Sequence, residues 1–189
     1  MAEVVLFHHI QGLTDGVRAL AGDLQVSGHT VHTPDLFEGR TFRSIQDGLA
    51  HVSEVGHEII VQRGLDAAAA VPHSAGLVYG GLSFGAGIAQ RLAQTTADAR
   101  GALLLESCLP EAEFGTWPSG LPAQIHGMVG DEFFAEDLPA ARALTEHEHV
   151  ELYEYAGDGH LFSDPSVETY APQAYAQMLG RLLAFLASV

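Results

Sequence analysis

With 189 residues, of which 47% are hydrophobic, the chain is long enough to form one globular domain with a sizeable core, and we expect residues 1–189 to form it. The formal net charge of −16 at pH 7 disfavours nucleic acid and anionic membranes as partners, since both bind basic surfaces. All eight basic residues are arginine, and the absence of lysine excludes a P-loop, a Schiff-base enzyme and a pyridoxal enzyme.

The first strand-like segment follows the N-terminal methionine almost directly. Residues 4–7 are apolar, and the basic and long apolar regions of a signal peptide are missing. No apolar run reaches the length of a transmembrane helix. Cys108 is the only cysteine, so an intrachain disulfide is impossible and a reducing compartment fits. We therefore expect a cytoplasmic protein.

Short apolar runs alternate along the chain with segments of helical spacing. Strands are expected at residues 4–8, 30–33, 77–81, 101–106, 123–129 and 150–156. Helices are expected at residues 16–25, 86–94, 135–146 and 172–187, and residues 44–70 are expected to be helical with a break near Gly64. This alternation predicts an α/β fold: a mostly parallel sheet of about six strands with helices on both faces. The irregular residues 107–122 are too few for a lid domain, so the site should be open.

The third expected strand ends in the motif Gly81-Leu82-Ser83-Phe84-Gly85, and a helical pattern follows it. Strand, sharp turn and helix around G-x-S-x-G form the arrangement of a nucleophile elbow. The two glycines lack the Cβ atoms that would clash in so tight a turn. We therefore expect Ser83 to present its hydroxyl group above the edge of the sheet as a nucleophile.

Two further reactive residues follow later strands: Asp131 after the strand at 123–129, and His160 after the strand at 150–156. Serine, acid and histidine in this chain order are typical of the α/β-hydrolase triad. Serine needs a base, which His160 would supply, and Asp131 would hold the histidine tautomer. Oxyanion donors are expected at the amide of Phe84 and, from the loop after the first strand, at the amide of Ile10.

Each of these residues also has a plainer interpretation. A lone G-x-S-x-G can be an ordinary strand–helix turn, Asp131 can be a helix N-cap, and His160 can be one of several surface histidines. Glu106, which also ends a strand, and Asp158 compete for the role of the acid. The combination of all three residues in order favours the triad of Ser83, Asp131 and His160.

Other polar residues give weaker signals. The pairs His8-His9 and His147-x-His149 lack a third ligand at a diagnostic spacing, so neither a metal site nor a cofactor is predicted. Cys108 has no neighbouring histidine in the sequence and is expected to be a packed thiol.

Along nearly its whole length the chain resembles the dienelactone hydrolase family, a branch of the α/β-hydrolase fold without a lid. The resemblance rests on residues 9–12, on Gly28 to Phe37 with its Pro-Asp-Leu-Phe ending, on the elbow at 81–87, on Gly130-Asp131-Glu132 and on residues 156–162. It implies a compact member of the fold, because the chain begins at what would be the third strand of the full fold.

The departures from this family bear on the substrate. The best-known members have Cys where this chain has Ser83, and Glu where it has His9, which makes His9 a candidate substrate-binding residue. Members that cleave dienelactone carry an Arg shortly after the catalytic histidine, whereas this chain has an acid, Asp164. This difference argues against dienelactone itself. Arg40 and Arg43 could face the site, although surface solvation is the simpler interpretation.

The sequence therefore predicts a serine hydrolase that cleaves carboxylic esters, lactones or thioesters through an acyl-enzyme, as a monomer or homodimer acting on a small molecule. A partly apolar substrate is suggested by Phe37, Phe84, Trp117, Phe133 and Phe162, some of which must belong to the core. Two alternatives remain: a non-catalytic binding protein with this fold, and a C–C bond hydrolase. Dehalogenases and epoxide hydrolases are disfavoured, because they need an acid at the elbow.

Overall fold

Six parallel strands form the sheet at the centre of the computed structural model, which describes residues 1–73 and 75–189. The strands are β1 (Glu3–Phe7), β2 (Thr30–His32), β3 (Val78–Leu82), β4 (Gly101–Leu105), β5 (Ala123–Met128) and β6 (Val150–Tyr155). Their order in the sheet is β2-β1-β3-β4-β5-β6, and every neighbouring pair is parallel. The order reverses between β1 and β3, and ligands of open α/β sheets bind at such a point.

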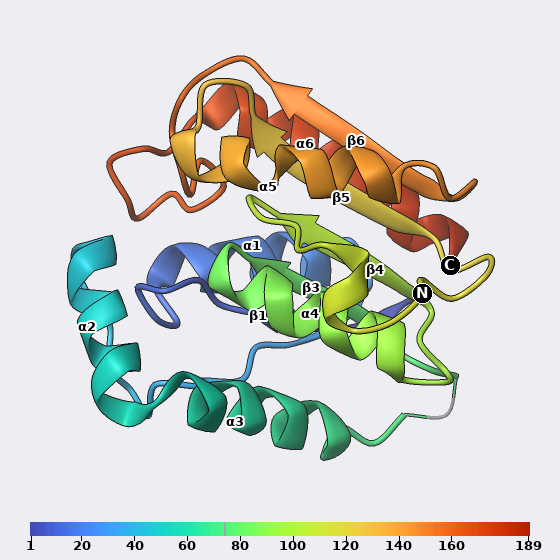
Figure 1. Cartoon of the computed structure of the whole chain (residues 1–189), viewed down its shortest axis with the longest axis horizontal. Coiled ribbons are helices and arrows are strands. Elements are labelled where there is room, and N and C mark those ends of the chain that lie inside the picture. The colour runs from blue at the N-terminus through green and yellow to red at the C-terminus, as the bar shows by residue number, and fades with distance from the viewer. Residues whose placement is uncertain (74) are drawn as a thin grey trace.

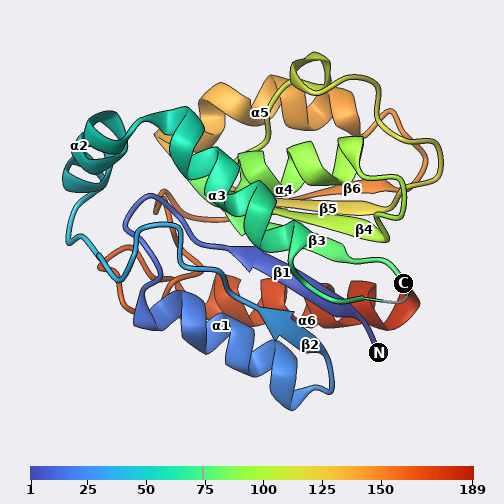
Figure 2. The same cartoon turned by 90° about the horizontal axis from the view of Figure 1, so that it is seen from below.

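Helices cover both faces of the sheet, as the sequence predicts. Figure 2 shows α1 (Asp15–Val26) and α6 (Pro172–Ser188) on one face. The other face carries α3 (His57–Ala69), α4 (Phe84–Thr95) and α5 (Glu132–Leu144). A further helix, α2 (Ile45–Val55), stands at one end of the molecule (Figure 1).

Two hydrophobic cores result from this layering, and the alternation of side chains along β1 divides that strand between them. Val5 and Phe7 pack into the core beneath α3, α4 and α5. Val4 and Leu6 point to the opposite face and join the core beneath α1 and α6. β1 is thus buried on both sides, which explains its continuous apolar run.

The expected helix at residues 44–70 is two helices, and the expected break near Gly64 is wrong. The chain turns at Gly56, whose φ of 102° lies in the region that favours glycine. Gly64 lies inside α3, where a Cβ atom would come within 3.0 Å of Ile88. Gly64 therefore serves close packing between α3 and α4, and does not interrupt the helix.

The other expected elements agree with the structure, apart from small shifts at their ends. The largest is at α5, which begins at Glu132 because Asp131 caps it. Residues 107–122 contain one short 3₁₀ turn, Glu111–Glu113. Among the described residues, no helix combines the length and the apolar character needed to cross a membrane.

Candidate active site

Ser83 lies at a strained turn between β3 and α4. Its φ of 47° is unusual for a residue with a side chain, and its amide donates to the Leu105 carbonyl oxygen at 2.7 Å. A Cβ atom on Gly81 would overlap the Gly85 carbonyl oxygen, and one on Gly85 would overlap the Phe7 carbonyl oxygen. Both glycines of the motif are therefore required by close backbone packing, and the turn has the geometry expected for an elbow.

The three residues predicted to form a triad are joined by hydrogen bonds. The Ser83 Oγ lies 2.8 Å from Nε2 of His160, and Nδ1 of His160 lies 2.7 Å from Oδ2 of Asp131. A carboxylate only accepts, so Nδ1 carries the proton and Nε2 is left to accept from the serine hydroxyl. His160 is thus oriented to take a proton from Ser83.

Asp131 has both of the roles that the sequence left open. One oxygen, Oδ1, accepts from the Phe133 amide at 2.9 Å and caps α5, while Oδ2 binds His160. Its side chain is 1% exposed, so water does not compete for either contact. The helix cap fixes the carboxylate in the orientation that His160 requires.

The loop that carries His160 is held from several sides. The Thr169 hydroxyl donates to the His160 carbonyl oxygen, and the amide of Gly130 donates to the Gly157 carbonyl oxygen at 2.8 Å. The ring of Phe133 packs on the imidazole of His160 with 4.7 Å between the centroids. These contacts bring the His160 loop against the loop that carries Asp131.

The two expected oxyanion donors lie on neighbouring parts of the chain. Phe84 is the first residue of α4, where helix amides lack intrahelical acceptors, and Ile10 lies in the loop after β1. Within the described residues, neither amide donates to another group of the chain. Because the first turn of α4 packs on the end of β1 at Gly85, the two amides come from adjoining segments.

Two cavities meet at His160 and Phe133, which line both. Ser83 faces the smaller one, whose volume is about 460 Å³. Its apolar wall consists of Val61, Phe84, Ile88, Leu109, Phe114 and Phe133. The larger cavity, of about 1060 Å³, is lined by the other loops around His160 and includes Arg43. An acyl group could occupy the smaller cavity next to Ser83.

In the described residues, neither competing acid forms a hydrogen bond with the imidazole of His160. Glu106 is fully buried at the end of β4 and accepts from the Ser163 amide at 2.9 Å through Oε1. Burial raises the pKa of Glu106, although the nearby His160 and Ser163 oppose this effect. Asp158 is exposed to solvent. The geometry therefore selects Asp131.

The structure corrects the expected substrate contact of His9. This side chain is fully buried, it lines neither cavity, and its Nε2 lies 2.6 Å from Oδ2 of Asp164. The sequence does not indicate this pair, because the two residues are 155 positions apart and no local pattern connects them. Of the two arginines considered, Arg43 lines the larger cavity and Arg40 is exposed.

The remaining expectations concern packed residues. Cys108 is buried, and burial raises the pKa of its thiol to about 12, which leaves it protonated and unreactive. Phe37, Trp117 and Phe162 belong to the cores, whereas Phe84 and Phe133 line the smaller cavity. Among the residues that the structure describes, no group of three His, Cys, Asp or Glu side chains is arranged to hold a metal ion.

Comparison by sequence finds neither a matching protein-family model nor a similar curated protein. Comparison by structure finds many similar proteins. One is described as a dienelactone hydrolase from Klebsiella pneumoniae, with a TM-score of 0.77, 17% identity, and coverage of 99% of this chain and 87% of the other. Another is a dienelactone hydrolase-like promiscuous phosphotriesterase from metagenomic libraries, with a TM-score of 0.78, 18% identity, and coverage of 100% and 86%.

A third structure is Thermogutta terrifontis esterase 2 phosphorylated by paraoxon. Its TM-score is 0.62 at 16% identity, and the match covers 99% of this chain and 82% of the esterase. At such low identity these matches establish the fold, which is that of the α/β hydrolases, and the activity has to be argued from the site.

Proposed function

We propose that this protein is a serine hydrolase that cleaves carboxylic esters, lactones or thioesters through an acyl-enzyme on Ser83. The observation that carries the proposal is the continuous hydrogen-bonded chain from Ser83 through His160 to Asp131, set at the point where the strand order reverses. The contact of 2.8 Å between Ser83 and His160 is within reach for proton transfer, and the contact of 2.7 Å to Asp131 holds the imidazole in place.

In the proposed reaction, Nε2 of His160 takes the hydroxyl proton as Ser83 Oγ forms a bond to the carbonyl carbon. The carbonyl π electrons move to oxygen, and the amides of Ile10 and Phe84 donate to that oxyanion. The oxyanion then collapses, the bond to the leaving group breaks, and His160 returns the proton to the leaving oxygen or sulfur. Asp131 stabilises the transient imidazolium and keeps its orientation.

Water completes the cycle in the same way. It gives a proton to Nε2 of His160 as its oxygen attacks the acyl carbon, and the proton passes to Ser83 Oγ as the acid leaves. No cofactor is needed for either half of the reaction. Because His160 lines both cavities, a water molecule or a leaving group can reach it from the larger cavity while the acyl group occupies the smaller one.

The smaller cavity supports a small, partly apolar acyl group. Its volume of about 460 Å³ lies within the range of roughly 300–1,000 Å³ that is usual for small-molecule sites, and aromatic and aliphatic side chains form much of its wall. The similar structures are consistent with ester chemistry, since they include an esterase and proteins named for dienelactone hydrolysis. Dienelactone itself is disfavoured by the sequence, because residues 161–164 after His160 offer no arginine to bind its carboxylate.

A fluorophosphonate probe tests the nucleophile directly. The wild-type protein should be labelled at Ser83, and Ser83→Ala should lose labelling completely, as peptide mass spectrometry would show. Ser107→Ala is a suitable control, since the Ser107 hydroxyl donates to Asp137 at 2.6 Å and to no histidine. Labelling that persists in Ser83→Ala would overturn the assignment of the nucleophile.

A panel of p-nitrophenyl esters of increasing acyl length tests the reaction. Turnover that depends on Ser83 supports an ester hydrolase. The preferred acyl length then indicates how large an acyl group the smaller cavity accepts. No turnover at any length, together with an unlabelled Ser83, would instead favour a binding protein with this fold. Labelling without ester turnover would favour another hydrolytic reaction, such as C–C bond cleavage.

A further inference from the structure

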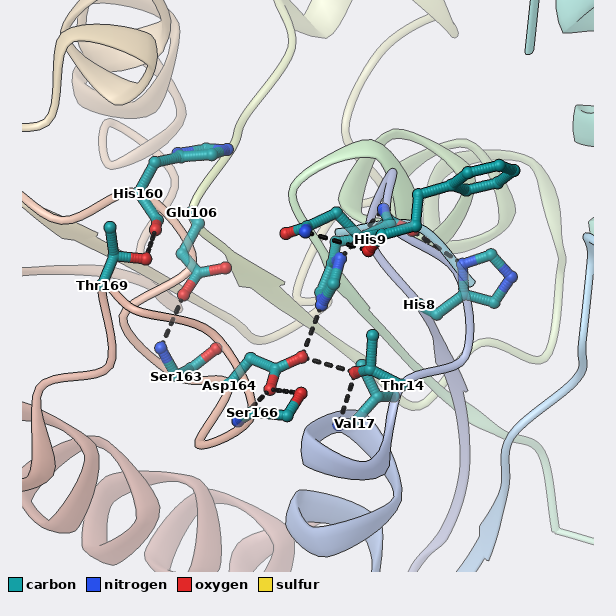
Figure 3. Close-up of polar contacts among 12 residues, drawn as sticks. His8, His9, Thr14, Val17, Glu106, His160, Ser163, Asp164, Ser166 and Thr169 are labelled. Carbon is teal, nitrogen blue, oxygen red and sulfur yellow. Dashed lines mark hydrogen bonds and ion pairs between the residues drawn. The ribbon is translucent and has the colours of Figure 1, made fainter. Parts of the chain in front are cut away.

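A polar cluster built around two fully buried side chains lies beside the proposed triad and has no part in the reaction as written above. It consists of His9, Thr14, Asp164 and Ser166, and its centre is the hydrogen bond of 2.6 Å between Nε2 of His9 and Oδ2 of Asp164 (Figure 3). Both members of this His9–Asp164 pair have side chains with 0% exposure. Such a buried pair is costly to desolvate unless every polar atom has a partner.

The contacts of His9 determine its protonation. The amide of Gln11 donates to Nδ1 at 3.1 Å, so Nδ1 carries a lone pair and no proton. The proton is therefore on Nε2, which donates to Asp164. His9 is a neutral imidazole with both nitrogens used, one by its own loop and the other by a distant segment.

Asp164 is held as a carboxylate. Although burial alone would raise it, hydrogen bonds from His9, Ser166 and Thr14 lower the pKa of Asp164 to about 2. The carboxylate also sits against the first turn of α1, where a Cβ atom on Gly16 would overlap it. The positive end of the helix dipole favours a negative charge at this place.

The pair joins the two loops on which the proposed reaction depends. His9 immediately precedes Ile10 in the loop after β1, and Asp164 follows His160 by four positions. A second contact holds the segment around Asp164, because the Ser163 amide donates to Glu106 at the end of β4. Figure 3 shows Glu106, Ser163 and Asp164 between His160 and His9.

The same histidine determines which amides of its loop are free. The Gln11 amide donates to Nδ1 of His9, and the Gly12 amide donates to the His9 carbonyl oxygen at 3.0 Å. In the described residues the Ile10 amide is left without an acceptor. His9 thus leaves available the one donor of this loop that the proposed oxyanion site uses.

We propose that His9 is a positioning residue of the proposed hydrolase, which holds the Ile10 amide in register with His160 through its bond to Asp164. The inference rests on the proposed function. It differs from a role in folding alone, because a loop that shifts by a fraction of an ångström weakens donation to the oxyanion while the ground-state complex is little affected.

Two substitutions separate the two contacts of His9. In His9→Gln the side-chain amide can still reach Asp164 but no longer accepts from Gln11, whereas in His9→Asn the shorter side chain can accept from Gln11 but does not reach Asp164. Each variant should lose about 10- to 100-fold in kcat on a p-nitrophenyl ester, with KM within about threefold of wild type. Affinity for a trifluoromethyl ketone, which forms an oxyanion on Ser83, should fall in proportion to kcat/KM.

His126→Asn is the matched control. His126 is also fully buried with its nitrogens in hydrogen bonds, and burial lowers its pKa to about 3, so it is neutral as well. This variant should lower the melting temperature but keep kcat. If folded His9→Gln and His9→Asn both keep kcat within about threefold of wild type, His9 is not a positioning residue.

A measurement on the unaltered protein decides the case in which neither His9 variant folds. ¹⁵N NMR of the imidazoles at pH 7 should show His9 protonated on Nε2 only, both before and after the trifluoromethyl ketone binds. A proton on Nδ1, in either state, would overturn the inference. The wild-type protein separates a failure of the proposed function from a failure of this inference. If the proposed function is wrong, the wild-type protein shows neither ester turnover nor labelling of Ser83.

Discussion

The carboxylate of Asp164 makes stability depend on pH in a direction that can be stated. Its pKa of about 2 in the folded protein lies below the ordinary value of 3.8, because hydrogen bonds from His9, Ser166 and Thr14 outweigh the effect of burial. Since folding lowers the pKa, the stabilisation is complete above about pH 4 and is lost as the pH falls towards 2. A shift of this size corresponds to about 2 kcal/mol at neutral pH.

Asp164→Asn should therefore lower the free energy of unfolding by about 2–3 kcal/mol at pH 7, measured by urea denaturation. The difference from wild type should shrink at pH 3, where the unfolded aspartate is protonated. Asp66→Asn, at an exposed position of α3, should change the free energy by less than about 0.5 kcal/mol at either pH. An equal loss for Asp164→Asn at both pH values would contradict a buried carboxylate.

At the level of single residues, the sequence predicted those site members that follow a strand end. Ser83 comes directly after β3, and Asp131 and His160 lie in the loops that follow β5 and β6; parallel strands bring such loops to one edge of the sheet. The His9–Asp164 pair was not predictable in this way. Asp164 follows no strand, and only the tertiary structure places it against the start of α1.

Among the elements, the junction of β1, β3 and α4 leaves no space for a side chain at Gly85. Gly85→Ala would drive a methyl group into the Phe7 and His8 carbonyl oxygens, which lie in the backbone and cannot rotate away. We expect this variant to lose at least about 2 kcal/mol of unfolding free energy and most of its ester turnover, as calorimetry and a p-nitrophenyl assay would show.

Gly22→Ala in α1 provides the comparison, because a Cβ atom at Gly22 has no neighbour within 4 Å. It should leave turnover unchanged and gain up to about 1 kcal/mol through helix propensity. If Gly85→Ala were as stable as Gly22→Ala, the close approach of α4 to β1 would be wrong.

Helix boundaries illustrate what a sequence pattern leaves undetermined. Residues 44–70 contain three glycines within a continuous helical pattern, and the pattern alone does not distinguish their roles. Gly48 and Gly64 are enclosed by other segments, namely Ile10 for the first and Ile88 for the second. Only Gly56 has a positive φ, so the helix ends there. The number of strands and their parallel direction, by contrast, agree with the prediction from the alternation of strand-like and helical segments, whereas the order of the strands in the sheet comes from the structure alone.

At the scale of the whole molecule, the net charge of −16 creates a negative field around the site. A cationic ester should therefore show a higher kcat/KM than an anionic ester of the same size at low ionic strength. The ratio should fall towards one as NaCl rises to about 0.5 M, because salt screens charges separated by more than a few ångströms. A ratio that does not change with salt would indicate local contacts, such as Arg43, in place of the overall field.

The two contacts of Asp131 limit which substitutions near it the protein can accept. One carboxyl group caps α5 with Oδ1 and orients His160 with Oδ2, so the first turn of a helix and the tautomer of the proposed base depend on the same side chain. Substitutions that loosen the start of α5 would therefore disturb the orientation of His160 before they disturb the packing of the core. The start of the helix and the proposed base are therefore constrained together. A substitution that disturbs α5 should lower the activity before it lowers the melting temperature.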